Sequence, residues 1–84
     1  MRWEREKGKL KVELLGDFNY ERVLKLKALL KEGEELEIDL KNCCFVDTEA
    51  VDLLYNLKLR GRRYRLLNRP ELLEKVCQIL GVEV

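Results

Sequence analysis

The sequence contains no histidine and no serine, and Thr48 is its only threonine. Neither a Ser–His or Cys–His nucleophile pair nor a histidine-ligated metal site can therefore be built from this chain alone. No spacing ties two carboxylates to a predicted pocket, and the thiols lack an activating histidine. We therefore expect a protein that is not an enzyme and that uses no cofactor.

The three cysteines do not form a disulfide or metal-binding pattern. Cys43, Cys44 and Cys77 are odd in number, and a vicinal pair plus a distant thiol is not a recognised zinc spacing. The sequence therefore predicts no disulfide framework and no metal site. Free cysteines usually behave as small hydrophobic residues, so we expect all three to be buried.

Long hydrophobic runs are missing, and the charges nearly cancel. The longest apolar run is residues 43–46, whereas a membrane-spanning helix needs about 20 apolar residues, and residues 1–6 lack a signal-peptide core. We expect a cytoplasmic protein with no membrane insertion.

The 17 basic and 16 acidic residues leave a net charge of +1, which argues against a nucleic-acid partner. The 84 residues have room for one core, so we expect a single domain over residues 1–84.

Turn residues divide the chain into seven elements. Alternating apolar residues predict strands near Trp3 and over residues 10–15, 36–40 and 64–67. Apolar spacings of three and four predict helices over residues 20–31, 50–60 and 70–80. We expect Gly16 and Asp17 to close the second strand, and residues 43–48 to form an apolar loop.

The order strand-strand-helix-strand-helix-strand-helix, with short connections, predicts an α/β fold with a four-stranded, mostly parallel sheet. Charged residues alternate with apolar ones along the strands, whereas strands buried on both faces are usually apolar throughout. The charged positions are Lys11, Glu13, Glu37, Asp39, Arg63 and Arg65. We expect the helices mainly on one face, and acidic and basic residues side by side on the other. Whether that charged face meets solvent or a partner stays open.

A basic run occupies residues 60–65. It could bind phosphate or nucleic acid, with Tyr64 offering a ring for stacking. The alternative is structural, with Gly61 ending a helix, Arg63 and Arg65 on the charged sheet face, and Tyr64 in the core. We favour the structural explanation, because opposite charges on neighbouring strands account for these residues.

The pattern with most bearing on function lies where the strand over residues 36–40 leads to a helix start at Asp47, Thr48 and Glu49. Partner and ligand sites of open α/β sheets gather at the carboxyl ends of strands and at the helix N-termini that follow. A purely structural explanation also exists, because Asp47 or Thr48 can cap the helix and Glu49 can interact with its dipole.

Residues 37–54 resemble the central signature of STAS domains, the module shared by anti-sigma-factor antagonists and the cytoplasmic parts of sulfate transporters. That signature is an Asp-bearing strand, a loop with an apolar pair, and Asp-Ser-Ser-Gly-Leu at a helix start. The resemblance extends over residues 10–80, and residues 61–68 match a Gly-x-x-Leu-x-Leu-x-Asn strand. It implies a STAS-like fold and a non-catalytic protein-interaction module.

The resemblance also implies roles at the helix start. Asp47 takes the place of the family's helix-start Asp, and Thr48 that of the first hydroxyl residue. Glu49 falls where antagonists carry the Ser that a partner kinase phosphorylates, and Ala50 replaces the usual Gly. Glu49 has a fixed charge and cannot be phosphorylated, so Thr48 is the remaining candidate phosphoacceptor.

An Asp-Thr pair here is also similar to the small STAS subunit of the bacterial Mla phospholipid-transport ABC complex, which binds the ATPase subunit. The chain therefore resembles an anti-sigma-factor antagonist or, alternatively, a transporter accessory subunit. Both imply a docking surface, for which we select Asp47, Thr48, Glu49, Asp52, Tyr55 and Asn56. The partner is then an anti-sigma factor kinase or a transporter ATPase, and homodimer formation stays open.

Overall fold

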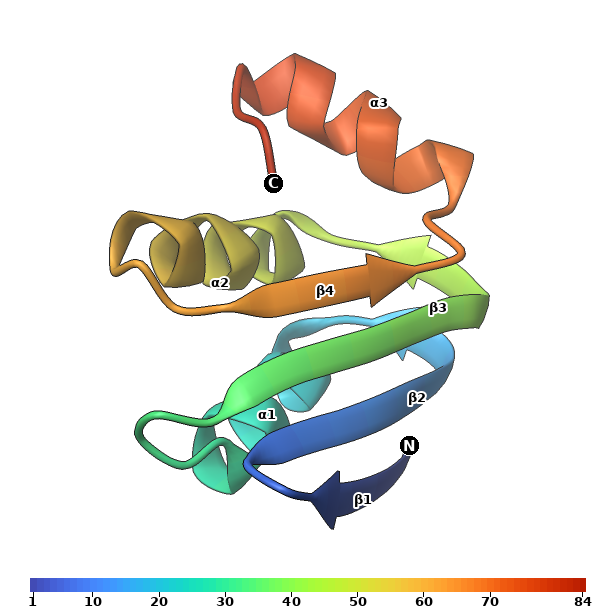
Figure 1. Cartoon of the computed structure of the whole chain (residues 1–84). Helices are drawn as coiled ribbons and strands as arrows, with labels where there is room; N and C mark the ends of the chain where they lie inside the picture. Colours follow the sequence, from blue (N-terminus) through green and yellow to red (C-terminus); the bar gives the residue numbers. More distant parts are fainter.

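Four strands form one sheet and three helices pack against it in the computed structural model, which describes all 84 residues (Figure 1). The strands are β1 (Arg2–Glu6), β2 (Lys9–Phe18), β3 (Glu35–Val46) and β4 (Tyr64–Leu67). The helices are α1 (Tyr20–Leu29), α2 (Thr48–Leu59) and α3 (Glu71–Leu80). The sheet order is β1-β2-β3-β4, in which β1 pairs antiparallel with β2 and the other neighbours are parallel. The predicted α/β class, element order and mostly parallel sheet are confirmed.

A tight turn joins β1 to β2. Lys7 and Gly8 both have positive φ, 46° and 77°. Two central residues with positive φ are typical of a type I′ turn, whose twist matches that of a β-hairpin. The turn pairs β1 antiparallel with β2, and β1 is an edge strand because β2 is its only neighbour.

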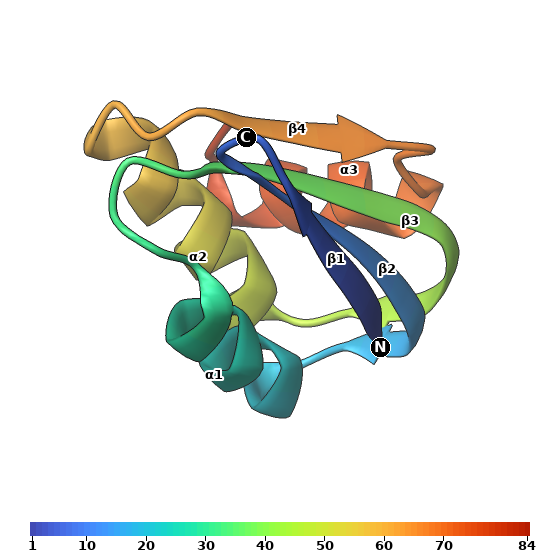
Figure 2. The same ribbon diagram turned by 60° about the horizontal axis from the view of Figure 1, so that its bottom comes forward.

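The helices lie together on one face of the sheet, as the tilted view shows (Figure 2). Alternate side chains of the central strands point toward them, because successive residues of a strand face opposite sides. The buried strand positions under the helices are Leu10, Val12, Leu14, Leu36, Ile38 and Leu40. They join buried helix residues such as Leu26, Leu54 and Leu73 in one core, so the predicted one-sided arrangement is confirmed.

The opposite face of the sheet is charged, as predicted. Glu37 lies between Lys11 and Arg65 in the strand register. The Lys9 Nζ atom is 3.8 Å from Glu37 Oε1, and Lys11 Nζ is 3.2 Å from Glu6 Oε2. Charges therefore cancel locally on this face, although exposed pairs of this kind contribute little to stability.

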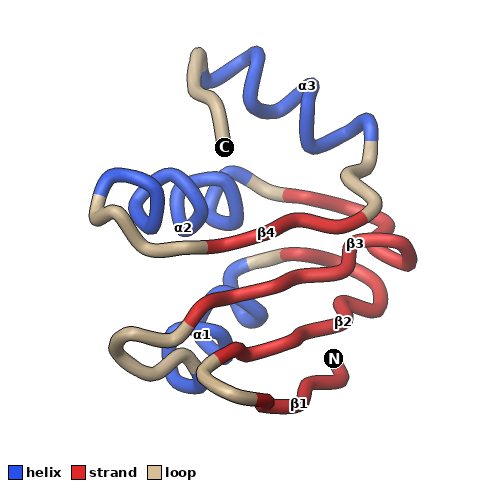
Figure 3. Tube along the Cα trace, viewed as in Figure 1, coloured by secondary structure: helices blue, strands red, loops and turns tan.

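The central strands are longer than predicted. β2 continues through Gly16 to Phe18, and β3 continues through residues 43–46, which we had expected to form a loop. Register shifts and the φ of +91° at Gly16 let the two strands bend without ending, and the pair curves together at one end of the sheet (Figure 3). Such bulges bend a strand while its pairing continues. The predictions of a strand end at Gly16 and of an apolar loop were wrong.

The prediction that every cysteine is buried was also wrong. Cys77 is buried, but Cys43 is only half-buried and Cys44 is exposed. Cys43 packs against the core, and the next side chain of a strand points to the other face, which carries Cys44 away from the helices. Burial raises the pKa of the Cys43 and Cys77 thiols.

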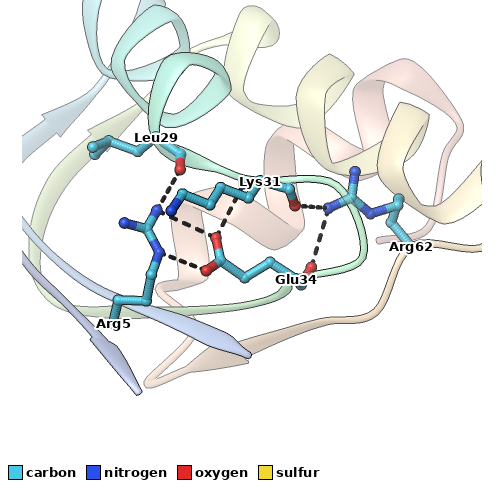
Figure 4. A network of polar contacts seen from close by, with 5 residues as sticks. All are labelled: Arg5, Leu29, Lys31, Glu34 and Arg62. Atoms are coloured by element: carbon cyan, nitrogen blue, oxygen red, sulfur yellow. Dashed lines mark hydrogen bonds and ion pairs between the residues drawn. The ribbon is translucent and has the colours of Figure 1, made fainter. Parts of the chain in front are cut away.

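A carboxylate that the sequence did not single out ties the turn after α1 to β1. Glu34 is 6% exposed, and its carboxylate accepts hydrogen bonds from the Arg5 guanidinium and from the backbone N–H of Lys31 (Figure 4). Arg5 also donates to the carbonyl oxygen of Leu29. These hydrogen bonds, chiefly that from Arg5, hold the pKa of Glu34 below its usual value.

The same turn is held from its other side by Arg62. Its Nη2 donates to the carbonyl oxygens of Lys31 and Glu34, at 2.9 and 3.1 Å (Figure 4). Arg62 follows α2, so one short turn joins β1, α1 and the α2–β4 connection. We conclude that Arg5, Glu34 and Arg62 have structural roles.

Candidate functional site

Asp47 connects the end of β3 to the first turn of α2. Its side-chain Oδ1 accepts a hydrogen bond from the backbone N–H of Ala50 at 3.1 Å, as an N-cap does. Its own N–H donates to the carbonyl oxygen of Phe18 at 3.2 Å, which fixes the helix start against the end of β2. Ala50 is fully buried, so its methyl group belongs to the core. Asp47 is therefore the N-cap residue of α2, as the structural explanation of this motif predicted.

The next two residues point outward. Thr48 and Glu49 are exposed at the start of α2, and no hydrogen bond ties down the Thr48 hydroxyl. Glu49 lies in the first turn, where a negative charge interacts favourably with the positive end of the helix dipole. The Thr48 hydroxyl is thus accessible.

An open groove runs from these residues to the C-terminal segment. Its volume is about 540 Å³, and it is lined by Thr48, Glu49, Val51, Asp52, Tyr55, Leu80 and Val82. Gly81 ends α3 in the left-handed conformation, and the N–H of Val82 donates to the Cys77 carbonyl oxygen at 3.0 Å. This cap turns the last residues back toward α2 (Figure 1). We call this feature the α2 groove.

The α2 groove combines an apolar floor with negative charge. Tyr55, Leu80 and Val82 supply apolar surface over the buried Val51, whereas Glu49 and Asp52 are the only charged lining residues of the groove. Neither carboxylate takes part in any of the ion pairs of the structure. The groove therefore presents unpaired acidic groups beside partly exposed apolar side chains.

Most of the selected site residues meet at this groove, but two do not line it. Asp47 is half-buried and acts as the cap, one residue before the groove begins. Asn56 lies on the flank of α2 that faces α1, and its Nδ2 donates to the Asp52 carbonyl oxygen at 2.9 Å. The sequence interpretation also missed Leu80 and Val82. The sequence shows only that Leu80 and Val82 are apolar residues on either side of Gly81, and no local pattern connects them to α2.

The basic run over residues 60–65 takes the structural arrangement that we favoured. Arg63 and Arg65 are exposed, and Tyr64 is half-buried against the core, where desolvation raises its pKa.

No three His, Cys, Asp or Glu side chains are grouped so that they could hold a metal ion. None of the helices has the length and apolarity needed to cross a membrane.

This combination of a β1-β2-β3-β4 sheet with three helices on one face is the STAS fold of anti-sigma-factor antagonists, so the expected fold is confirmed. The structure of the anti-sigma factor antagonist SpoIIAA in its unphosphorylated form is similar, with a TM-score of 0.71 at 19% identity. The match covers 93% of this chain and 81% of that chain. The crystal structure of Mglu is also similar, with a TM-score of 0.60 at 19% identity over 83% of this chain and 19% of that one. No protein-family model and no curated protein sequence matches the chain.

Proposed function

We propose that the chain is a non-catalytic, cytoplasmic regulator that binds a protein partner at the α2 groove, as an anti-sigma-factor-antagonist-like module. One observation carries the proposal: Thr48, Glu49, Asp52 and Tyr55, selected from the sequence, line one groove together. The fold shared with SpoIIAA, an anti-sigma factor antagonist, supports the same class of function.

The composition of the α2 groove suits a protein partner. Protein interfaces combine an apolar, often aromatic centre with a polar rim, and here Tyr55 lies beside Leu80 and Val82. The carboxylates of Glu49 and Asp52 have no ion-pair partner within the chain. Complementary charge speeds association and suppresses wrong partners, so the partner presents lysine or arginine to this rim.

Thr48 is the proposed phosphoacceptor. Its hydroxyl is exposed, and a phosphate there adds about −1.5 to −2 charge at neutral pH beside Asp47, Glu49 and Asp52. Incubation with ATP and a purified kinase-type partner, followed by mass spectrometry, should place phosphate on Thr48 and not on a Thr48→Val variant. Absence of phosphate from Thr48 would remove this part of the proposal.

The test of docking uses purified proteins encoded by neighbouring genes, measured by biolayer interferometry. An Asp52→Arg variant reverses an exposed charge of the groove without removing any side-chain hydrogen bond of Asp52. Glu21→Arg is the matched control, because it reverses an exposed helix charge on α1. We expect Asp52→Arg to weaken binding at least tenfold and Glu21→Arg less than twofold.

The identity of the bound protein separates the two functions considered. Binding of a kinase-type anti-sigma factor supports the proposal, whereas binding of a transporter ATPase alone selects the accessory-subunit alternative. Equal binding by wild type and Asp52→Arg would show that the partner docks elsewhere on the domain.

A further inference from the structure

The outer edge of β1 has no neighbour within the chain. β1 pairs only with β2, and neither Figure 1 nor Figure 2 shows a helix or loop along its other side. A two-residue turn joins the two strands, and bonded and non-bonded pairs alternate along an antiparallel ladder. The backbone N–H and C=O groups of Trp3 and Arg5 therefore point away from β2. No backbone hydrogen bond outside the sheet and helices involves these two residues, so the edge is open to a further strand.

Protection of a free edge is the simpler explanation for the sequence of β1, because charged side chains discourage pairing with other strands. Four of its five residues are charged, and all five are exposed. These charges, however, are of both signs, so they oppose a second copy of the strand in some registers and attract it in others. The one uncharged residue is Trp3, which is 48% exposed. An exposed tryptophan is typical of interfaces and does not protect an edge.

The charges of β1 select one register for antiparallel pairing with a second copy. Side chains alternate between the two faces of a strand, so the helices of both copies stay on one side only in every second register. Registers that place Glu4 opposite the partner's Glu4 or the partner's Glu6 are disfavoured, because like charges directly opposite each other repel. The remaining register that pairs most of the strand places Trp3 on the two-fold axis, opposite the partner's Trp3. It also places Arg2 opposite the partner's Glu4.

This register continues an alternation of charge across the open face of the sheet. From β4 to β1, one row of neighbouring positions consists of Arg65, Glu37, Lys11 and Glu4. Glu4 ends the row and has no ion-pair partner within the chain. Arg2 donates to Glu13 through Nε and Nη2, which leaves its Nη1 for the partner's Glu4. Pairing of two copies therefore gives Glu4 the counter-ion that a single chain does not provide.

The aromatic side chain at the centre of this register is already held in place. Trp3 lies on the helix side of β1, because it is paired with the buried Val12. The guanidinium carbon of Arg5 is 5.5 Å from the centre of the Trp3 ring, and hydrogen bonds to Glu34 fix that guanidinium. A cation at this distance attracts the face of the ring and so orients it. In the two-fold pair the two Trp3 side chains lie side by side, and aromatic cross-strand pairs are favourable.

We propose that the chain forms a homodimer in which β1 pairs antiparallel with β1 of a second copy and joins the two sheets into one. Trp3 lies on the two-fold axis, and an Arg2–Glu4 pair on either side of it sets the register. The interface is one strand wide, at the low end of interface sizes below about 1,200 Å², so the dimer should form and dissociate with concentration. No residue of β1 lines the α2 groove, so the dimer does not depend on the proposed protein docking.

Sedimentation equilibrium of the whole chain without a tag, from micromolar to millimolar concentration, measures the association. Trp3 is the only tryptophan, so intrinsic fluorescence over the same series reports directly on the proposed interface. We expect conversion of monomer to dimer as concentration rises. The Trp3 emission should move to shorter wavelength over the same range, because the indole ring leaves water.

Two charge reversals test the register. Arg2→Glu and Glu4→Arg each place like charges opposite each other at both pairs, so each should weaken self-association at least tenfold. In an equimolar mixture of the two variants both pairs are again of opposite sign. The mixed dimer should therefore form at least tenfold more tightly than either variant associates with itself. Arg65→Glu reverses an exposed charge on β4, the other edge of the sheet, and should change self-association less than twofold. The far-UV circular dichroism of all variants should match that of the wild type.

The proposal is wrong if the chain stays monomeric at millimolar concentration, or if a dimer forms without any change in Trp3 emission. It is also wrong if either charge reversal associates as tightly as the wild type, or if the mixture of the two variants yields no mixed dimer. Asp52→Arg, which tests docking at the α2 groove, should leave self-association unchanged. Failure of the docking proposal and failure of the dimer are therefore distinguishable.

Discussion

The Asp47 side chain brings both a hydrogen-bond acceptor and a negative charge to the start of α2, and two replacements separate these properties. Asp47→Ala removes the Oδ1 acceptor of the N-cap bond to Ala50, while the backbone bond from Asp47 N to Phe18 O can remain. Loss of an N-cap side chain costs about 1 kcal/mol, within a range of about 0.5–2 kcal/mol. Asp47→Asn keeps an oxygen acceptor and removes only the charge, so it should retain most of the unfolding free energy.

These values give a measurable change in a domain of this size. For 84 residues, a loss of about 1 kcal/mol corresponds to a decrease in Tm of about 4–8 °C. Urea unfolding followed by far-UV circular dichroism gives the free energy directly, with an unchanged slope if only stability is altered. Asp52→Ala is the control on the same helix, because the exposed Asp52 side chain makes no hydrogen bond, and we expect a change within about 0.5 kcal/mol.

Two outcomes would contradict this reasoning. If Asp47→Ala is as stable as the wild type, the hydrogen bond to Ala50 does not stabilise α2. If Asp47→Asn is as unstable as Asp47→Ala, the charge matters and the capping geometry does not. A stable Asp47→Asn protein then shows in binding experiments whether the partner requires a carboxylate at this position.

Three further predictions concern stability and thiol chemistry. The pKa of Glu34 is lowered, so its contribution to stability is complete above about pH 4.3 and is lost as the pH falls through its lower folded-state value. Glu34→Gln should therefore destabilise more at pH 7 than at pH 3 in urea titrations, and equal losses would contradict this. Leu54→Ala, at a fully buried position, should cost about 2–5 kcal/mol in the same assay, and a loss below about 1 kcal/mol would show that the site is not tightly packed. A thiol reagent should label exposed Cys44 within the native protein and buried Cys77 only on unfolding, as peptide mass spectrometry would show; labelling of both at one rate would be inconsistent with this burial.

Local patterns were enough to predict the order of elements and the side of the sheet that the helices cover. The alternation of charged and apolar residues along β2 and β3 reports directly which face is buried, because the side-chain period of a strand is two. The signals for helix starts and ends are also local in the sequence. Asp47 caps α2, and Gly81 ends α3 in the left-handed conformation. Each of these features depends on residues that are neighbours in the sequence.

The features that were missed depend on residues far apart in the chain. Gly16 looked like a strand end, yet β3 provides a curved partner that keeps β2 paired beyond it. Glu34 looked like one more acid in a charged turn, and only the fold brings Arg5, 29 residues away, to its carboxylate. Leu80 and Val82 join Tyr55 for the same reason: Leu80 ends α3, which packs against α2, and the turn at Gly81 carries Val82 back to α2.

The geometry of α2 limits how its first turn can be regulated. Successive helix residues are about 100° apart, so Thr48 and Glu49 point in different directions, whereas Thr48 and Asp52 are four residues apart and lie on one face. A phosphate on Thr48 would therefore lie beside the Asp52 carboxylate, where like charges at this spacing repel. Glu49 is three residues before Asp52 and is also its neighbour on the helix surface, so its fixed charge already lies on the other flank of the same carboxylate. Phosphate at Thr48 would thus add a switchable charge next to Asp52, in a groove where Glu49 already supplies a constant one.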